Sequence, residues 1–236
     1  MSEPYLLLWL EAPLQSWGHD SKFGRRDSLD FPTKSGVLGL LCCARGTAGE
    51  QADWLQIWSD RDLQVTAYVR TDRKGQPLPR LPLLRDFQMV GSGYDDKDPW
   101  ASLLIPKTSE GKKAVGGGTK MTYRYYLQDM AYAVALQGPD AELQELAEAL
   151  QNPVWDLYLG RKTCVPTEFV CQGIHAELDH AMQCASELAD EKSLRAIFRV
   201  LQGEHEGEAL TLNDVPLQFG EHKRYRDRRV TVQKLE

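Results

Sequence analysis

The sequence has no long apolar run: no stretch approaches the roughly 20 consecutive apolar residues of a membrane-spanning helix. It also lacks the start of a secretory leader, because Glu3 stands where a leader carries basic residues and Pro13 interrupts the apolar stretch that follows. The cysteines number five, an odd count that is typical of reduced thiols rather than of a disulfide framework. We therefore expect a cytoplasmic protein with no membrane contact.

Recognisable catalytic motifs are also missing. There is no G-x-S-x-G nucleophile motif, and Gly118-Thr119-Lys120 has the residues of a phosphate-binding loop in the wrong order. Metal-independent RNA cleavage needs a base, an acid and a cation around one hydroxyl, and His19 and His222 are the best candidates for the base. Neither histidine forms a convincing set with its sequence neighbours, so we predict no catalytic residue.

Four potential metal ligands lie close together in the sequence: Cys171, His175, His180 and Cys184. Within a helix, His180 and Cys184 would share one face, with His175 within reach. The spacing is nevertheless looser than that of the paired ligands in zinc sites. We interpret these residues as surface histidines and buried thiols, and we predict neither a metal nor a cofactor.

A strong basic excess is absent too, since the net charge is −6. Local charge, however, decides which partner a surface binds. The acids concentrate in 140–148, 177–191 and 204–214, and we expect the acidic 177–214 region to face protein. The bases cluster at 22–45, 107–124 and 223–229. Where they alternate with Tyr123, Tyr125 and Tyr126, the pattern suits an RNA backbone with unstacked bases.

Hydrophobic periodicity predicts an α+β fold in which residues 1–160 form one domain. Strands are predicted at 5–10, 63–70, 125–127 and 131–136, and 155–159 is predicted as a strand or an extended segment; one face of 63–70 should be solvated. Helices are predicted at 35–46, with Ser35 as N-cap and Gly46 as C-cap, and at 140–150, and a loop is predicted at 12–18. The order β-α-β, arm, β-α-β is the ferredoxin-like order that RNA-recognition (RRM-like) domains also use.

Two parts of the chain are less regular. Residues 71–124 predict a long β-hairpin arm with a mobile tip near 116–118, because glycine, proline and charge dominate there. Residues 161–236 predict a smaller C-terminal extension that packs on the domain. In it we expect a helix at 176–189, a strand or helix at 193–201 and a strand at 228–235.

Five blocks of sequence resemble the signature blocks of the CasD-type (Cas-five) family of CRISPR-associated proteins. The blocks are 12–18 (APLQSWG), 31–41 (FPTKSGVLGLL), 83–87 (LLRDF), 122–129 (TYRYYLQD, running on to VAL at 134–136) and 158–164 (YLGRKTC). The resemblance covers residues 4–175 and is poor over the last sixty residues. It implies a repeat-associated RNA-binding fold with a ferredoxin-like core and a thumb-like hairpin arm.

The resemblance also implies a function and partners. The chain would be a non-catalytic subunit of the type I-E Cascade complex in antiviral defence, capping the complex and gripping the 5′ handle of CRISPR RNA (crRNA). Its neighbours would be the backbone subunits and the large PAM-recognising subunit, and target DNA would be bound only through the complex. A related subunit in the type I-C branch cleaves the repeat RNA, whereas another subunit cuts in type I-E.

The candidate RNA-binding residues follow from these blocks and from the basic clusters. At the start of the 35–46 helix we expect a phosphate held by Thr33, Lys34 and Ser35, and in the 12–18 loop a base that is stacked and read by Gln15 and Trp17, with close backbone approach at Gly18. After Gly160 we expect phosphate contacts from Arg161 and Lys162. At the arm base we expect adjacent nucleotides to be separated by Lys120, Tyr123 and Arg124, and Arg25 and Arg45 flank the first loop and helix. Hydrophobic packing is an equal alternative for Trp17.

Two other functions remain open from the residues. One is a metal-independent endoribonuclease that processes repeat RNA, which a fitted Tyr/Lys/His cluster would favour. The other is a protein-interaction module whose basic residues are only solvated.

Overall fold

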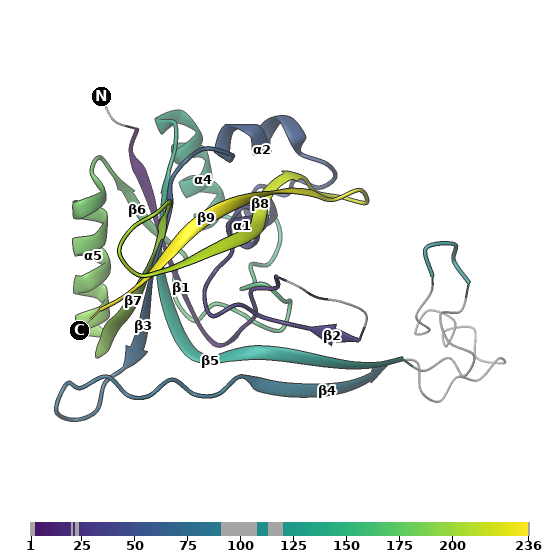
Figure 1. Ribbon diagram of the computed structural model, residues 1–236. Coiled ribbons are helices and arrows are strands. Elements are labelled where there is room, and N and C mark those ends of the chain that lie inside the picture. Colours follow the sequence, from purple (N-terminus) through teal and green to yellow (C-terminus); the bar gives the residue numbers. More distant parts are fainter. Residues whose placement is uncertain (1–2, 20, 22–23, 91–107, 113–119, 236) are drawn as a thin grey trace.

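The computed structural model describes residues 3–19, 21, 24–90, 108–112 and 120–235. Its elements are β1 (Tyr5–Gln15), β2 (Arg25–Arg26), α1 (Lys34–Arg45), α2 (Ala52–Trp58), β3 (Leu63–Arg70), β4 (Leu84–Val90), β5 (Lys120–Gln137), α4 (Asp140–Gln151), β6 (Cys171–His175), α5 (Leu178–Glu191), β7 (Leu194–Gln202), β8 (Glu208–Gln218) and β9 (Arg224–Lys234). Figure 1 shows a sheet that has α5 on one face and α1, α2 and α4 on the other.

The described strands form one sheet with the order β6-β1-β5-β3-β7-β9-β8. In its first four strands, β1 pairs antiparallel with both β5 and β6, and β3 pairs antiparallel with β5. The sheet continues through β7, β9 and β8, so it runs across the predicted boundary at residue 160. The C-terminal residues therefore extend the central sheet edge to edge.

The two faces of the sheet carry different cores. Leu6, Leu8 and Leu10 of β1 point into the larger core with α1 and α4, whereas Leu7 and Trp9 point toward α5. The helix α4 buries the predicted apolar stripe of leucines and alanine over residues 143–150. The prediction that one face of β3 is solvated is wrong, because α5 covers that face and only Arg70 of the strand is exposed.

The loop predicted at 12–18 is also partly wrong, since β1 continues to Gln15. Pro13 is tolerated because it falls between the paired residues Ala12 and Leu14, at a site where β6 no longer pairs with β1. The two strands predicted at 125–127 and 131–136 are a single strand, β5, in which Asp129 adopts a positive φ of 48°.

Residues 155–159 form no strand in the described structure but a loop that closes on the end of β1. The amide of Ser16 donates to the carbonyl oxygen of Leu159 at 3.1 Å. Gly160 follows with a φ of 89°, and any side chain there would overlap the carbonyl oxygen of Ser16. The loop therefore lies against β1 because residue 160 is a glycine.

The arm is a β-hairpin, as predicted in outline. β4 pairs antiparallel with the first part of β5, from Leu84 opposite Tyr126 to Val90 opposite Lys120. Figure 1 shows both strands running away from the central sheet, with β2 beside β5. The predicted mobile tip at 116–118 lies outside the described residues.

The C-terminal predictions are confirmed with adjusted bounds. The helix at 176–189 is α5, residues 193–201 form the strand β7, and the last strand is β9. The strand β8 was not predicted. It pairs with β9 along its whole length and completes the edge of the sheet.

Candidate nucleic-acid interface

The base of the arm is a three-stranded sheet in which β5 lies between β2 and β4. Arg25 lies opposite Tyr123, Phe87 lies opposite Tyr123 on the other side, and Arg85 lies opposite Tyr125. Directly paired residues, and residues two apart on one strand, share a face of a sheet. These five residues therefore lie on one surface, which we call the arm face.

The arm face is exposed and mixes arginine with aromatic rings. Phe87 and Tyr123 are 48% and 42% exposed, although large aromatics are usually buried. Their ring centroids are 5.3 Å apart. The guanidinium of Arg25 lies 5.3 Å from the Tyr125 ring centroid, and that of Arg85 lies 5.7 Å from the Tyr123 centroid. Arg25 also forms an exposed salt bridge with Asp27 at 2.8 Å.

Such a surface has the chemistry of a single-strand nucleic-acid platform. Unstacked bases stack on aromatic rings and guanidinium planes, and arginine donates to phosphate oxygens. The methionines Met89 and Met121 lie opposite each other and continue the arm face toward the tip, both exposed. Their side chains are flexible and adapt to an irregular partner surface.

The sequence prediction named Arg25 and Tyr123 on this surface but missed Arg85 and Phe87. Both stand in the block 83–87, and their period-two alternation was a usable signal.

The other side of the arm sheet is fixed by Arg161. Its guanidinium donates to the carbonyl oxygens of Tyr125 (3.2 Å) and Arg26 (2.9 Å) and lies 4.6 Å from the Tyr126 ring centroid. The side chain thus ties the 155–164 loop to the arm. Arg161 was predicted as a phosphate contact, but these bonds already engage two sides of its guanidinium. Arg124 is half-buried on this same side, opposite Arg26.

The predicted phosphate site at the start of the first helix is wrong. The N-cap lies two residues earlier than predicted, at Thr33 rather than Ser35, and the Thr33 hydroxyl accepts from the amide of Gly36 at 3.1 Å. The amide of Lys34 donates to a carboxylate oxygen of Asp214 at 2.8 Å. A protein carboxylate and a hydroxyl therefore occupy the position that a phosphate would take.

Lys34 itself is fully buried and turned inward. Its Nζ donates to the carbonyl oxygens of Ser59 (3.2 Å) and Arg61 (2.7 Å). Burial, followed by repulsion from Arg228, lowers the pKa of Lys34 to about 8. With no exposed atom, Lys34 does not meet an RNA phosphate in this structure.

The predicted base readers Gln15 and Trp17 are also buried, at 0% and 1% exposure. The Gln15 amide donates to the carbonyl oxygens of Leu10 (3.1 Å) and Met130 (2.7 Å) and accepts from the Trp17 indole N–H at 3.1 Å. The packing alternative for Trp17 is therefore correct. Gly36 lies directly under the indole, where a Cβ would be 2.8 Å from the ring.

The remaining predicted residues are not gathered at one place. Gly18 is exposed at the end of the buried 15–17 segment, and Ser35 is half-buried beside Thr33. Arg45 lies at the opposite end of α1, with its guanidinium 4.9 Å from the Trp54 ring centroid. Lys162 is exposed, whereas the side chain of Lys120 lies outside the described residues.

The arginines of the C-terminal basic cluster (223–229) pair with other side chains of the same chain. Arg228 forms a buried bidentate salt bridge with Asp214, Arg226 pairs with Asp60 and Arg229 with Glu204. Arg224 donates to the Gln218 amide oxygen. These pairs connect β9 to β8 and to neighbouring loops, and Lys223 is exposed.

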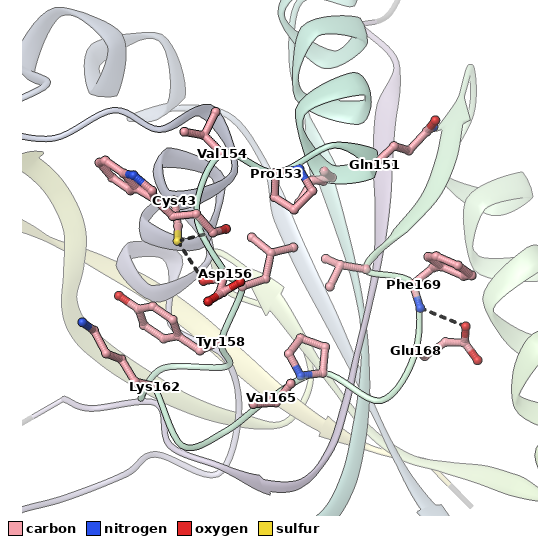
Figure 2. Close-up of a pocket in the computed structure, with 15 residues that line it drawn as sticks. Cys43, Gln151, Pro153, Val154, Asp156, Tyr158, Lys162, Val165, Glu168 and Phe169 are labelled. Atoms are coloured by element: carbon pink, nitrogen blue, oxygen red, sulfur yellow. Dashed lines mark hydrogen bonds between the residues drawn. The ribbon is translucent and has the colours of Figure 1, made fainter.

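A groove of about 900 Å³ opens beside the 155–164 loop. Figure 2 shows it between the end of α4 and the loop, with Tyr158 and Lys162 at one end and Phe169 at the other. Phe169 is 82% exposed, and Val154, Trp155 and Val165 are exposed as well. Exposed apolar side chains are therefore gathered around this groove.

No hydrogen bond or ion pair of the described residues engages the His19 or His222 side chain, and both residues are exposed. Lys22, beside His19, lies outside the described residues. Among the helices that the structure describes, none has the length and apolar character to cross a membrane.

Comparisons with known proteins agree on one family. A family model described as CRISPR-associated protein (Cas_Cas5) matches residues 5–231. The Cascade subunit CasD of Escherichia coli (strain K12) is 34% identical over 165 residues, which is 68% of this chain and 66%, just under two thirds, of that protein.

Two solved structures are similar over nearly the whole chain. One is a chain of a CRISPR RNA-guided surveillance complex, with a TM-score of 0.70 and 29% identity over 98% of this chain and 90% of that one. The other is a Cas protein, with a TM-score of 0.55 and 26% identity over 98% and 95% of the two chains. The chain therefore belongs to the Cas5 family of CRISPR-associated proteins.

Proposed function

We propose that this protein is the CasD-type subunit of a type I-E Cascade complex and that it binds the 5′ handle of crRNA without cleaving it. The observation that carries the proposal is the exposed arm face, in which arginines alternate with aromatic rings at the base of a projecting hairpin. In this proposal the subunit acts in the cytoplasm and serves antiviral defence through the complex.

The fold supports the proposal. The order β6-β1-β5-β3, all antiparallel, with α1 and α4 on one face is the strand order of a ferredoxin-like domain. We assign the core to this class, with β4 and the first part of β5 as the inserted arm. RNA-recognition domains of the same class also present aromatic and basic side chains on strands.

The chemistry of the arm face suits a splayed RNA strand. Each base that stacks on Phe87 or Tyr123 would contribute about 1–3 kcal/mol, with little dependence on its identity. Arg25 and Arg85 would hold the phosphates on either side. The handle would thus be gripped by the arm, and not by the start of α1 as the sequence suggested.

The proposed partners are the backbone subunits that line the guide and the large PAM-recognising subunit, with target DNA bound only by the assembly. The exposed apolar groove around Phe169 supports assembly, since an obligate subunit covers such surface on a neighbour. The acidic residues of α5 would offer a further surface for a protein partner, the role expected of the 177–214 region from the sequence.

The alternative function is a metal-independent endoribonuclease. It requires a base, an acid and a cation within hydrogen-bond reach of one another. Among the described residues no hydrogen bond joins His19 or His222 to such a group, and Lys34 is buried. We therefore favour binding without cleavage.

The test uses end-labelled repeat RNA in EDTA, with the chain alone and with the chain assembled with its partner subunits. Native and denaturing gels of the same samples separate binding from cutting. We expect intact, shifted RNA, and affinity at least tenfold weaker in the double variant Arg85→Ala/Tyr123→Ala, since about 1.4 kcal/mol is tenfold. The matched control is Arg195→Ala, an exposed arginine on β7.

Salt dependence gives a second reading of the same variants. Each phosphate contact that is lost should flatten the dependence of log affinity on log salt by about 0.7. Equal affinities for the arm-face variant and the Arg195→Ala control would contradict the proposal. Discrete cleavage that disappears in His19→Ala or His222→Ala would establish the nuclease instead.

A further inference from the structure

His175, His180 and Cys184 come together beside α5 and form what we call the His–Cys cluster. His175 ends β6, and His180 and Cys184 lie one helical turn apart on α5. One ligand atom from each residue can be chosen so that all three lie within 4.8 Å of one another. Figure 1 shows α5 alongside β6, which is the edge strand of the sheet.

We propose that the His–Cys cluster binds a Zn²⁺ ion through two imidazole nitrogens and one thiolate. Borderline-soft zinc prefers this donor set to the carboxylate and carbonyl oxygens that hold magnesium or calcium. The loose sequence spacing gave no zinc pattern. The structure supplies the proximity because a two-residue turn joins the strand to the helix.

The distances fit a tetrahedral ion with small adjustments. Zinc–nitrogen bonds of about 2.0–2.1 Å and zinc–sulfur bonds of about 2.3 Å place tetrahedral ligand atoms about 3.4–3.6 Å apart. The Nδ1 atoms of His175 and His180 are 3.2 Å apart, and Cys184 Sγ lies 3.9 Å from His180 Nε2. These contacts use different nitrogens of His180, so its exposed ring turns to offer one of them to the ion.

The surroundings of His175 prepare it as a ligand. Its Nε2 lies 3.3 Å from the carbonyl oxygen of Gln172. A neutral ring donates to a carbonyl only from its protonated nitrogen, so Nε2 carries the hydrogen and the lone pair of Nδ1 faces the cluster. Metal-bound histidines are commonly oriented in this way by a backbone carbonyl.

Without metal, the same groups form a complete hydrogen-bond chain. The Cys184 thiol donates to His180 Nε2, His180 Nδ1 donates to His175 Nδ1, and His175 Nε2 donates to Gln172. Binding Zn²⁺ breaks this chain. The thiol loses its proton to solvent when the thiolate binds the ion, so metal affinity should rise with pH.

The fourth position is left to water. Cys171, the fourth residue of the sequence cluster, packs against the larger core, whereas α5 covers the opposite face of the sheet. Three protein ligands and one open position make a site that a water molecule or a neighbouring subunit completes.

The ion would fasten α5 to the sheet edge. The helix packs on the sheet mainly through Ala181, Ala185 and Ala189, which bury little apolar area. Because metal binds the folded arrangement, it should raise the temperature of unfolding as its concentration exceeds the dissociation constant.

The test uses the full-length chain without a histidine tag, after treatment with a chelator. Co²⁺ is the probe, because tetrahedral thiolate sites give strong visible bands and a sulfur-to-cobalt charge-transfer band. We expect one Co²⁺ per chain, displaced by Zn²⁺, with a higher unfolding temperature in Zn²⁺. Cys184→Ser should abolish the charge-transfer band, and His180→Ala should weaken binding at least about 100-fold.

Two controls separate the site from general metal binding. His205→Ala removes an exposed histidine elsewhere, and Cys171→Ser removes the thiol on the other face; both should keep the Co²⁺ spectrum and the pH dependence. His180 is exposed, so its alanine variant should fold normally by circular dichroism. An unchanged spectrum in Cys184→Ser, or no tetrahedral Co²⁺ spectrum in the wild-type chain, would overturn the proposal.

Discussion

Replacing Asp214 by alanine should be among the most destabilising single changes in the protein. Its carboxylate is 2% exposed and accepts from Arg228 Nε at 2.7 Å and Nη2 at 2.9 Å. It also accepts from the amide of Lys34 in the first turn of α1. The alanine variant leaves a buried guanidinium without a counter-charge and a helix amide without an acceptor.

The magnitude follows from these two losses. Removing one partner of a buried ion pair costs about 3–5 kcal/mol, and losing an acceptor at a helix N-terminus costs about 1 kcal/mol more. The sum, about 4–6 kcal/mol, is a large part of the 5–15 kcal/mol that is typical of a whole domain. Chemical denaturation of the purified chain measures the free energy of unfolding directly.

A double variant separates the charge from the packing. Asp214→Leu/Arg228→Met removes both charges together and should recover most of the stability that Asp214→Ala loses, since paired apolar replacements of buried ions are often neutral. The reasoning is refuted if Asp214→Ala unfolds within about 1 kcal/mol of the wild type, or if the double variant is as unstable as the single one.

Three further changes test other parts of the fold. Gly160→Ala should lower the free energy of unfolding by at least about 3 kcal/mol, because φ is positive at Gly160 and a side chain would overlap Ser16. The control Gly75→Ala also has a positive φ but open space around it, and it should lose only about 1 kcal/mol in the same denaturation assay. Thr33→Ala should lower the free energy of unfolding by about 1 kcal/mol through loss of the α1 cap, while Thr33→Ser should retain it. Lys34, with its pKa lowered from 10.5 to about 8, keeps its proton longer in the unfolded chain. Between these two pH values the wild type should therefore gain up to about 3 kcal/mol relative to Lys34→Met, and no gain would contradict the reasoning.

The sequence correctly predicted the helices and strands whose hydrophobic pattern lies within a single segment. The apolar run at 5–10 and the stripe of α4 depend on periodicity within one segment, and both elements form as expected. The strand β8 was missed although Leu210 and Leu212 alternate with polar residues, since the acids at 204–214 were interpreted only as part of a protein-facing surface. Local charge outweighed a correct but short pattern.

The site predictions failed where a distant partner decides the role of a residue. Lys34 and Thr33 start a helix, which favours a phosphate site in isolation. Asp214, 180 residues later, fills that site, and no local sequence pattern around Lys34 or around Asp214 indicates that the two residues pair. Tyr123 was named because β5 carries a local signal of alternating basic and aromatic residues, whereas Arg25, on β2, was named only as a flanking base. Their role in RNA binding stays a prediction.

The proposed RNA-binding arm face is compatible with an acidic chain. The exposed acids of α4 and α5 lie on the helices that cover the two faces of the central sheet, whereas the arm face projects beyond it (Figure 1). Charges separated by more than about 8–10 Å are largely screened at physiological salt. A negative net charge does not by itself oppose a phosphate at the arm, because the sign of the local surface, not of the whole chain, determines its ligand.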